Sequence, residues 1–241
     1  MRLVADLHVH TVSSGHAYST LEEYIAQAKK VGLEGLAITD HGPAMPGGPH
    51  YYHFSNMRML PHAMNGIRIL RGVEANIIDA DGQIDLKDEE IRWGELDIVM
   101  AAMHPRVGYD DQGEAKNTAV LLKTMQNPLV NIIAHPGNPK YPVNIKETVA
   151  AAKEHGVLIE INNSSDFSRP GSHQRCVEIA REVKRIGWKV VVGTDSHVSP
   201  MLGVFNDACK LLAEAGLTED DLVNTSWAKI EQYLLRRSEG Y

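Results

Sequence analysis

Short apolar segments recur along the whole chain, and stretches with helical periodicity separate most of them. Seven such segments are present: Leu3–His10, Gly35–Asp40, Ile67–Glu74, Leu96–Met103, Leu129–Ala134, Val157–Ile161 and Lys189–Thr194. Continuous apolar runs of this length are typical of strands that are buried on both faces. Because strands that alternate with helices form parallel β/α units, we predict an α/β fold, specifically a distorted (β/α)7 TIM-like barrel with C-terminal helices. An open doubly wound sheet is the structural alternative.

The intervening sequence predicts four main helices and two more near the C-terminus. The four are Thr20–Val31, Asn117–Gln126, Asn144–His155 and Ser172–Ile186, and the C-terminal pair is Met201–Ala215 and Ser226–Arg237. Thr20 and Glu23 have the spacing of a capping box at the start of the first helix. Three glycines stand between a helix and the next strand, where a left-handed C-cap is expected: Gly32, Gly156 and Gly187.

The length and charge of the chain limit its organisation and its partners. No linker, low-complexity run or shift in composition interrupts the 241 residues, so we predict a single domain over residues 1–241. The 24 basic and 31 acidic residues give a formal net charge of −7, and we find no basic run or tail. This balance argues against nucleic acid as a partner, because non-specific binding needs a basic face. An anionic substrate stays compatible with it, since bound metal ions add positive charge that the count omits.

Cysteine usage and hydropathy predict a cytoplasmic protein without a membrane partner. Cys176 and Cys209 each lie on an apolar helical stripe, which predicts buried free thiols and a reducing compartment. Asp6 and His8 interrupt the N-terminal apolar stretch, so it lacks the character of a signal peptide. No uncharged apolar run approaches the roughly 18–20 residues that a membrane span requires.

Histidine and acidic residues close six of the seven predicted strands. These residues are His8, His10, His41, Glu74, His104, His135, Asp195 and His197, and His16 follows the first strand shortly afterwards. Residues i and i+2 of a strand share a face, so His8 and His10 converge with a spacing that suits a metal ion bound at roughly 2.0–2.1 Å per nitrogen. The carboxyl ends of all barrel strands meet at one face, where two loops rich in Gly and Pro, His41–Asn56 and His135–Pro142, are expected to form the rim. The set exceeds the three or four ligands of one ion, so we predict two or three ions, with a carboxylate such as Glu74 as a bridge.

The same segments resemble the motifs of the PHP superfamily, which is named after polymerase and histidinol phosphatase. The resemblance rests on Asp6–His10, Ser14–His16, Ile38–His41, Gly72–Glu74, His104, His135–Asn138 and Gly193–His197. It covers nearly the whole chain, and further segments such as Gly15–Thr20, His53–Arg58 and Glu160–Ser165 are most similar to the YcdX-type phosphatases. The resemblance implies a distorted (β/α)7 barrel, a trinuclear site that usually holds zinc, and a homo-oligomer such as a trimer.

Carried over position by position, the resemblance implies three metal positions. The first ion is held by His8, His10, Glu74 and Asp195, the second by Glu74, His104 and His135, and the third by His16, His41 and His197. Glu74 is thus the bridge between the first two ions. All nine positions carry the residue type that the family uses. Zinc is the expected metal, with manganese or iron as alternatives, because imidazole–carboxylate sites accept all three. Asp40 is a candidate to orient a neighbouring histidine, and a turn-capping role is its alternative.

The predicted activity is hydrolysis of phosphomonoesters, with a small phosphorylated molecule as the substrate. A divalent metal lowers the pKa of bound water towards about 7 and so supplies hydroxide at neutral pH. Glu74 and Asp195 are the predicted catalytic carboxylates. Arg169 is the first candidate to bind phosphate oxygens, followed by Arg58 and Lys140, and a solvated surface charge is the alternative for each.

Three other functions share parts of this pattern. An amidohydrolase-type enzyme that cleaves C–N bonds also begins with His-x-His and ends with an Asp at a strand terminus, but it does not need His16, His41 and His197 as a third set. A metal-dependent nuclease is disfavoured by the missing basic groove. A non-catalytic metal-binding module is the remaining alternative, because the sequence does not reveal an open coordination position.

Overall fold

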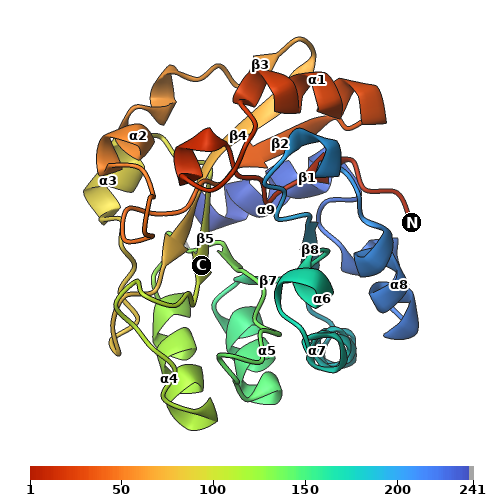
Figure 1. Ribbon diagram of the computed structural model, residues 1–241. Helices are drawn as coiled ribbons and strands as arrows, with labels where there is room; N and C mark the ends of the chain where they lie inside the picture. The colour runs from red at the N-terminus through yellow and green to blue at the C-terminus, as the bar shows by residue number, and fades with distance from the viewer. Residues whose placement is uncertain (239–241) are drawn as a thin grey trace.

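The computed structural model describes residues 1–238, and its central element is a parallel sheet that curves into a nearly closed barrel (Figure 1). The strands of the barrel are β1 (Ala5–Asp6), β2 (Gly35–Ile38), β4 (Ile67–Asn76), β5 (Ile98–Ala102), β6 (Ile132–Ile133), β7 (Leu158–Asn162) and β8 (Val190–Gly193). They are hydrogen-bonded in the order β1-β2-β4-β5-β6-β7-β8, and each neighbouring pair is parallel. The segments that follow β1 and β8 meet at an isolated bridge between Val9 and Ser196. The predicted barrel is therefore confirmed, and the open doubly wound sheet is not the fold of this chain.

The first strand is shorter than predicted, because a side chain takes the place of a ladder hydrogen bond. The prediction was Leu3–His10, whereas β1 covers only Ala5–Asp6. Beyond β1 the Val9 N–H donates to the hydroxyl of Thr39 at 3.0 Å instead of to a strand carbonyl. The isolated bridge of Val9 with Ser196 still holds this segment beside the end of β8. The two histidines that flank Val9 therefore reach the carboxyl end of the barrel on irregular backbone.

An additional strand that the sequence analysis did not predict, β3 (Ala63–Met64), pairs antiparallel with β4. The two strands are joined by Asn65 and Gly66, whose φ angles are 52° and 84°. Positive φ at both central residues is typical of the type I′ turn, which fits the twist of a two-residue hairpin. β3 lies off the path of the barrel strands.

Most of the predicted helices are present, and α4, α5 and α7 lie side by side outside the sheet (Figure 1). The longer helices are α1 (Leu21–Val31), α4 (Glu114–Met125), α5 (Ile145–Glu154), α7 (His173–Ile186), α8 (Asn206–Glu214) and α9 (Trp227–Ser238). The predicted capping box is confirmed at α1, where the Thr20 N–H donates to the Glu23 carboxylate at 2.7 Å. The prediction Met201–Ala215 is wrong in its first part. Gly203 has a left-handed φ of 76° and interrupts the segment before α8 begins.

Several short helices were not predicted. They are α2 (Tyr51–Ser55), α3 (Asp88–Trp93) and α6 (Ser165–Ser168), together with 3-10 turns at Val12–Ser14, Met57–Met59, Ser199–Met201 and Glu219–Asp221. α2 lies inside the predicted loop His41–Asn56, where the ring of His50 accepts the Tyr52 N–H at 3.3 Å and caps its first turn. α6 follows β7 directly and carries the chain towards Arg169.

Two apolar layers build the core, one around the barrel and one inside it. The outer layer packs strand residues such as Ile159 against helix residues such as Val177. The inner layer is closed by α9 through Trp227 and Ile230. Trp227 lies against Gly35 at the start of β2, where a Cβ atom would come within 2.4 Å of the indole ring. α9 thus covers the amino ends of the strands, and the opposite, carboxyl ends are left for a functional site.

Both cysteines are free thiols, as predicted, although only Cys176 is fully buried and Cys209 is partly exposed. Within residues 1–238, no helix combines the length and the apolar character needed to cross a membrane.

Candidate metal centre

The structure brings all nine predicted ligand residues into one connected cluster at the carboxyl ends of the strands. His8 and His10 converge as their i, i+2 spacing predicted, with the two Nε2 atoms 3.0 Å apart. His104 and His135 approach each other with ring centroids 5.2 Å apart, and His41 lies edge-on to His104 at 5.0 Å. The remaining members, His16, Glu74, Asp195 and His197, adjoin these five.

Glu74 lies at the centre of the cluster, buried at the end of β4. Its Oε1 atom is 2.7 Å from His135 Nε2 and 3.5 Å from His104 Nε2. Its Oε2 atom is 2.8 Å from His41 Nδ1 and 3.5 Å from the Nε2 atoms of both His8 and His10. One carboxylate thus faces imidazoles from four different strand ends. This arrangement is the one expected of a bridging ligand.

Asp195 provides a second buried carboxylate, at the end of β8. Its Oδ1 atom is 3.2 Å from His10 Nε2 and 3.6 Å from His8 Nε2. Its Oδ2 atom accepts a hydrogen bond of 2.9 Å from Nη2 of Arg169. Arg169, the first predicted phosphate-binding residue, therefore lies beside the cluster. Its Nη1 atom is buried and has no hydrogen-bond partner.

The rings of His16, His41 and His197 form the outer side of the cluster. The His16 ring lies 4.9 Å from that of His41 and 5.0 Å from that of His197, and His16 is exposed to solvent. His10 also approaches His41 and His197, at 4.3 and 4.4 Å between centroids. The histidines thus form a continuous layer from the buried interior to the surface.

Three groups of potential ligand atoms lie within 4.8 Å of one another: His10, His41 and His197; His8, His10 and Glu74; and His41, Glu74 and His104. The second group is part of the set implied for the first ion. The other two groups mix the implied sets. His41 of the third set is grouped with Glu74 and His104 of the second, and His10 of the first set is grouped with His41 and His197 of the third. The division of the nine residues among ions stays a prediction.

The donor set fits divalent metal ions on two observations. His41 Nδ1 and Glu74 Oε2 are both buried and lack a hydrogen-bond partner, although they lie 2.8 Å apart. Buried polar atoms are rarely left unsatisfied, and a metal ion bound by both atoms would satisfy this neighbouring pair. Imidazole nitrogens and carboxylate oxygens are, in addition, the ligands that zinc prefers in sites with open positions.

Burial and mutual contact perturb the acid–base properties of the cluster. Burial, reinforced by neighbouring His41, lowers the pKa of His10 to about 3, and burial lowers the pKa of His104 well below its usual value. Burial alone would raise the pKa of Glu74, but the surrounding imidazoles outweigh it and hold this pKa well below its usual range. Burial likewise opposes the charged form of His8, yet nearby carboxylates raise its pKa well above the usual value. Glu74 is therefore kept ionised and His10 and His104 are kept neutral, the protonation states that metal ligands need, whereas His8 would release a proton on binding a metal ion.

Two of the candidate ligands are held on unusual backbone. His135 has a φ of 33° and Asp195 a φ of 56°. Residues other than glycine adopt this left-handed region at a cost, and such strain concentrates at functional sites. At both positions the backbone turns directly after a strand and directs the side chain into the cluster.

Buried polar residues outside the predicted set orient the histidines. The Asp40 carboxylate accepts the Ser14 hydroxyl at 2.7 Å, and Ser14 contacts His10 Nδ1 at 3.1 Å. Asp40 also accepts the Thr11 N–H at 2.7 Å, so the structure supports both the orienting role and the turn-capping role considered for it. Asn76 Oδ1 similarly lies 2.8 Å from His104 Nδ1. In both cases the contact occupies Nδ1 and leaves Nε2 directed towards the centre.

Sequence reasoning missed Asn76 and, more importantly, Glu160, whose Oε1 lies 2.7 Å from His8 Nδ1. A signal was present, because Glu160 and Asn162 are polar residues at alternate positions of an otherwise apolar strand. Alternate residues share one face of a strand, which indicated that both face the same side of the barrel.

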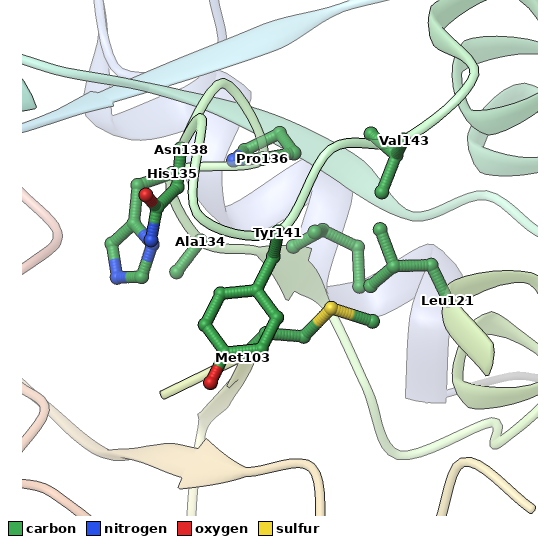
Figure 2. A pocket seen from close by; sticks show the side chains of 9 residues that line it. Met103, Leu121, Ala134, His135, Pro136, Asn138, Tyr141 and Val143 are labelled. Atoms are coloured by element: carbon green, nitrogen blue, oxygen red, sulfur yellow. The ribbon is translucent and has the colours of Figure 1, made fainter. Parts of the chain in front are cut away.

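The two other predicted phosphate-binding residues, Arg58 and Lys140, are exposed, and we find no contact between either side chain and the cluster within residues 1–238. Lys140 belongs to the loop that starts at His135. Figure 2 shows this loop with the His135 ring on one side and the apolar side chains of Met103, Leu121 and Val143 on the other. Successive hydrogen bonds from Asn138 N–H to His135 O and from Tyr141 N–H to Asn138 O, both 3.1 Å, hold the loop. The loop is ordered by these contacts without any involvement of the Lys140 ammonium group.

The sequence of the chain matches the profile of the PHP domain over residues 6–226. The chain belongs to the PHP domain family. Among its PHP relatives are proteins named "Probable phosphatase" from Thermoanaerobacter sp. (46% identity over 97% of this chain and 95% of the relative) and from Acetivibrio thermocellus (45% identity over 99% and 98%).

Solved structures show the same fold at lower identity. A crystal structure of histidinol phosphate phosphatase from Lactococcus lactis, complexed with zinc, L-histidinol and phosphate, superposes with a TM-score of 0.65 at 20% identity and covers 89% of this chain and 94% of that one. A Xaa-Pro dipeptidase crystallised with methionine in its active site superposes with a TM-score of 0.59 at 12% identity and covers 98% of this chain and 76% of that one. Because both identities are low, these likenesses concern the barrel fold and not the reaction.

Proposed function

We propose that this protein is a metal-dependent phosphatase that hydrolyses phosphomonoesters at a site for three divalent ions, of which zinc is the expected species. The observation that carries the proposal is the buried Glu74 carboxylate, which lies 2.7–3.5 Å from nitrogen atoms of five histidines. The names of the relatives that are 45–46% identical support the same chemistry.

For the individual ions we keep the assignment that the family resemblance implies, although two of the compact groups of ligand atoms cross it. His8, His10, Glu74 and Asp195 would hold the first ion, and Glu74, His104 and His135 the second. His16, His41 and His197 would hold the third. When bound, divalent ions supply hydroxide near neutral pH and polarise the phosphoryl oxygens. Three ions less the charges of Glu74 and Asp195 leave about +4 in the site, which attracts a phosphate dianion to a chain that is acidic overall.

The protein itself contributes charged side chains near the phosphate and a barrel that is closed at its amino end. Arg169 is placed beside Asp195, so its guanidinium can add a hydrogen bond to a phosphate oxygen. Glu74 and Asp195 stay ionised because imidazoles surround them. The inner apolar layer and α9 close the amino end of the barrel, so substrate enters from the carboxyl end, where His16 is exposed.

Several accompanying expectations form part of this proposal. We expect residues 1–241 to act as one domain in the cytoplasm, with a small phosphorylated molecule as the substrate. We also expect a homo-oligomer, such as a trimer, in solution.

The direct test is hydrolysis of p-nitrophenyl phosphate by purified protein before and after chelation. We expect activity that disappears with the metal and returns when zinc or manganese is added. An amide substrate assayed in parallel separates this proposal from a C–N hydrolase. If the metal-loaded protein cleaves amides and leaves phosphate esters intact, the proposed function is wrong.

A further inference from the structure

β7 contributes none of the nine predicted metal ligands, yet two of its side chains face the cluster. Glu160 and Asn162 are 2% and 4% exposed, although the strand around them is apolar. A buried carboxylate requires partners that compensate its charge. The partners of Glu160 therefore indicate what this strand does.

The Glu160 carboxylate joins the ends of β1 and β6. Its Oε1 atom lies 2.7 Å from His8 Nδ1, and its Oε2 atom accepts the backbone N–H of His135 at 2.8 Å. Both oxygens are thus occupied by donors from two different candidate ligands. Glu160 is for this reason poorly placed to bind a metal ion itself and well placed to fix the two residues that do.

Asn162 extends the connection to β8. Its amide nitrogen lies 3.2 Å from Glu160 Oε2 and 3.2 Å from Asp195 Oδ2, and its Oδ1 atom accepts the Ser164 N–H at 2.9 Å. The amide therefore donates to two carboxylates that would otherwise repel each other. Through this pair of side chains, β7 contacts His8, His135 and Asp195, which come from three other strand ends.

The backbone around Glu160 leaves space for the contact with His8, and Glu160 in turn bonds to the backbone of His135. A Cβ atom at Gly193 would lie 2.5 Å from Glu160 Oε1 and 2.4 Å from His8 Cβ, so only glycine allows the two side chains to meet. His135 and Asp195 both have positive φ angles. Backbone of this kind persists when neighbouring contacts determine it, and Glu160 bonds directly to the His135 N–H.

We propose that Glu160, supported by Asn162, is a positioning residue that fixes His8, His135 and Asp195 for the first two metal ions. The inference rests on the proposed metal site and assigns β7 its role in it. Acceptance of the His8 Nδ1–H by Glu160 selects the tautomer whose Nε2 lone pair faces the centre. A carboxylate partner of this kind also increases the basicity of a ligating imidazole. Among the described residues, His16, His41 and His197 make no direct contact with Glu160, and only His197 is linked to it indirectly, through Asp195, so we expect the third position to be the least affected.

Glu160→Gln tests this role because it keeps the shape of the side chain and changes its hydrogen bonding. Glutamine offers one acceptor and one donor, whereas both partners of Glu160 are donors. Either the amide N–H faces the His135 N–H as a second donor, or it faces His8 Nδ1 and requires the His8 proton to move to Nε2, the atom that faces the centre. We expect the affinity for the two inner zinc ions to fall about 10- to 100-fold, with the outermost ion retained. Zinc titration with elemental analysis, under a competing chelator, measures both quantities without an activity assay.

The control is Ile159→Ala. Ile159 directly precedes Glu160 on β7, and its side chain lies on the opposite face of the strand, within the outer apolar layer. It should lower the melting temperature and leave the zinc affinities as in the wild type. Glu160→Asp provides a second variant that keeps the charge but is one methylene too short to reach both partners. We expect it to weaken the inner sites as well, and circular dichroism verifies the fold of each variant.

The possible outcomes separate this inference from the proposed function. If wild-type protein binds no zinc, the proposed metal site itself is wrong. If wild-type protein binds zinc and Glu160→Gln or a folded Glu160→Asp variant binds all ions with unchanged affinity, β7 has no positioning role. Equal weakening of inner and outer ions by Glu160→Gln, or the same loss in Ile159→Ala, would mean a general loss of stability and would also overturn the inference.

Discussion

Replacement of Arg169 by lysine should reduce phosphatase activity without removing metal. The Arg169 side chain is only 13% exposed. Its guanidinium donates through Nη2 to Asp195 at 2.9 Å, while the Nη1 atom is buried and has no hydrogen-bond partner. Arginine can thus hold Asp195 with one nitrogen and offer the second to a phosphate oxygen after a small movement of the side chain. A lysine ammonium keeps the charge but lacks the two-pronged geometry, so it cannot make both contacts in the same way.

The size of the effect follows from one lost hydrogen bond to a charged group. Such a bond contributes about 1.5–3 kcal/mol. Since each 1.36 kcal/mol corresponds to a factor of ten in rate, we expect kcat/KM to fall by about 10- to 150-fold in Arg169→Lys. The inhibition constant of inorganic phosphate should rise by a similar factor, because phosphate uses the same contact.

The assay is hydrolysis of p-nitrophenyl phosphate at saturating zinc, with metal content determined for each preparation. Arg185→Lys is a matched control, because Arg185 is 65% exposed and pairs with Glu182 on α7. It should leave both constants unchanged. If Arg169→Lys stays within about threefold of the wild type in both constants while its metal content is normal, Arg169 does not bind phosphate and the argument is refuted.

Two further predictions concern the protein outside the metal centre. Burial raises the pKa of the Cys176 thiol to about 11, so this thiol stays protonated at pH 8. Ellman's reagent should therefore modify only the partly exposed Cys209 in the native protein and both cysteines after unfolding. Rapid modification of two thiols in the native protein would contradict this prediction. Thr20→Ala removes the capping box of α1 and should lower the free energy of unfolding by about 1 kcal/mol and the melting temperature by about 2–4 °C. The zinc content should not change. A thermal melt and metal analysis of the same sample check both expectations.

The sequence was sufficient for the barrel and for the location of the site because both depend on simple rules. Buried parallel strands are recognisable as apolar runs, and the carboxyl ends of such strands converge in a barrel. His104 and His135, which are the second residues after β5 and β6, could therefore be placed near Glu74 without any knowledge of side-chain conformations. The i, i+2 rule also predicted the contact of His8 with His10, even though regular strand geometry ends before them.

Other features depended on information that spacing alone does not contain. Whether His41 faces Glu74 or His16 is decided by rotamers and by the loops between strands, so the division of the histidines among ions could not be derived. Glu160 was missed because it lies within β7 and not at its end. The ligands were located from polar residues at strand ends. That criterion does not select a residue in the interior of a strand, such as Glu160.

The hairpin of β3 and β4 is a different case, because its turn carried a recognisable signal. Asn65 and Gly66 form the dipeptide that two-residue hairpins prefer, yet the strand before them has only two residues and no clear apolar alternation. Similarly, the short helix α2 depends on a cap by the ring of His50, an unusual capping residue.

The central claim is that Glu74 bridges metal ions, and metal analysis of Glu74→Gln tests it most directly. The measurement is the number of zinc ions per chain in wild-type and variant protein, each loaded with zinc and separated from free metal. Glu74 contacts all the imidazoles assigned to the two inner ions, whereas its contact with the outermost set is through His41 and leaves His16 and His197 to hold that position. We predict about three ions per chain in the wild type and about one in the variant. Fewer than two ions in the wild type, or an unchanged number in Glu74→Gln, would contradict the account.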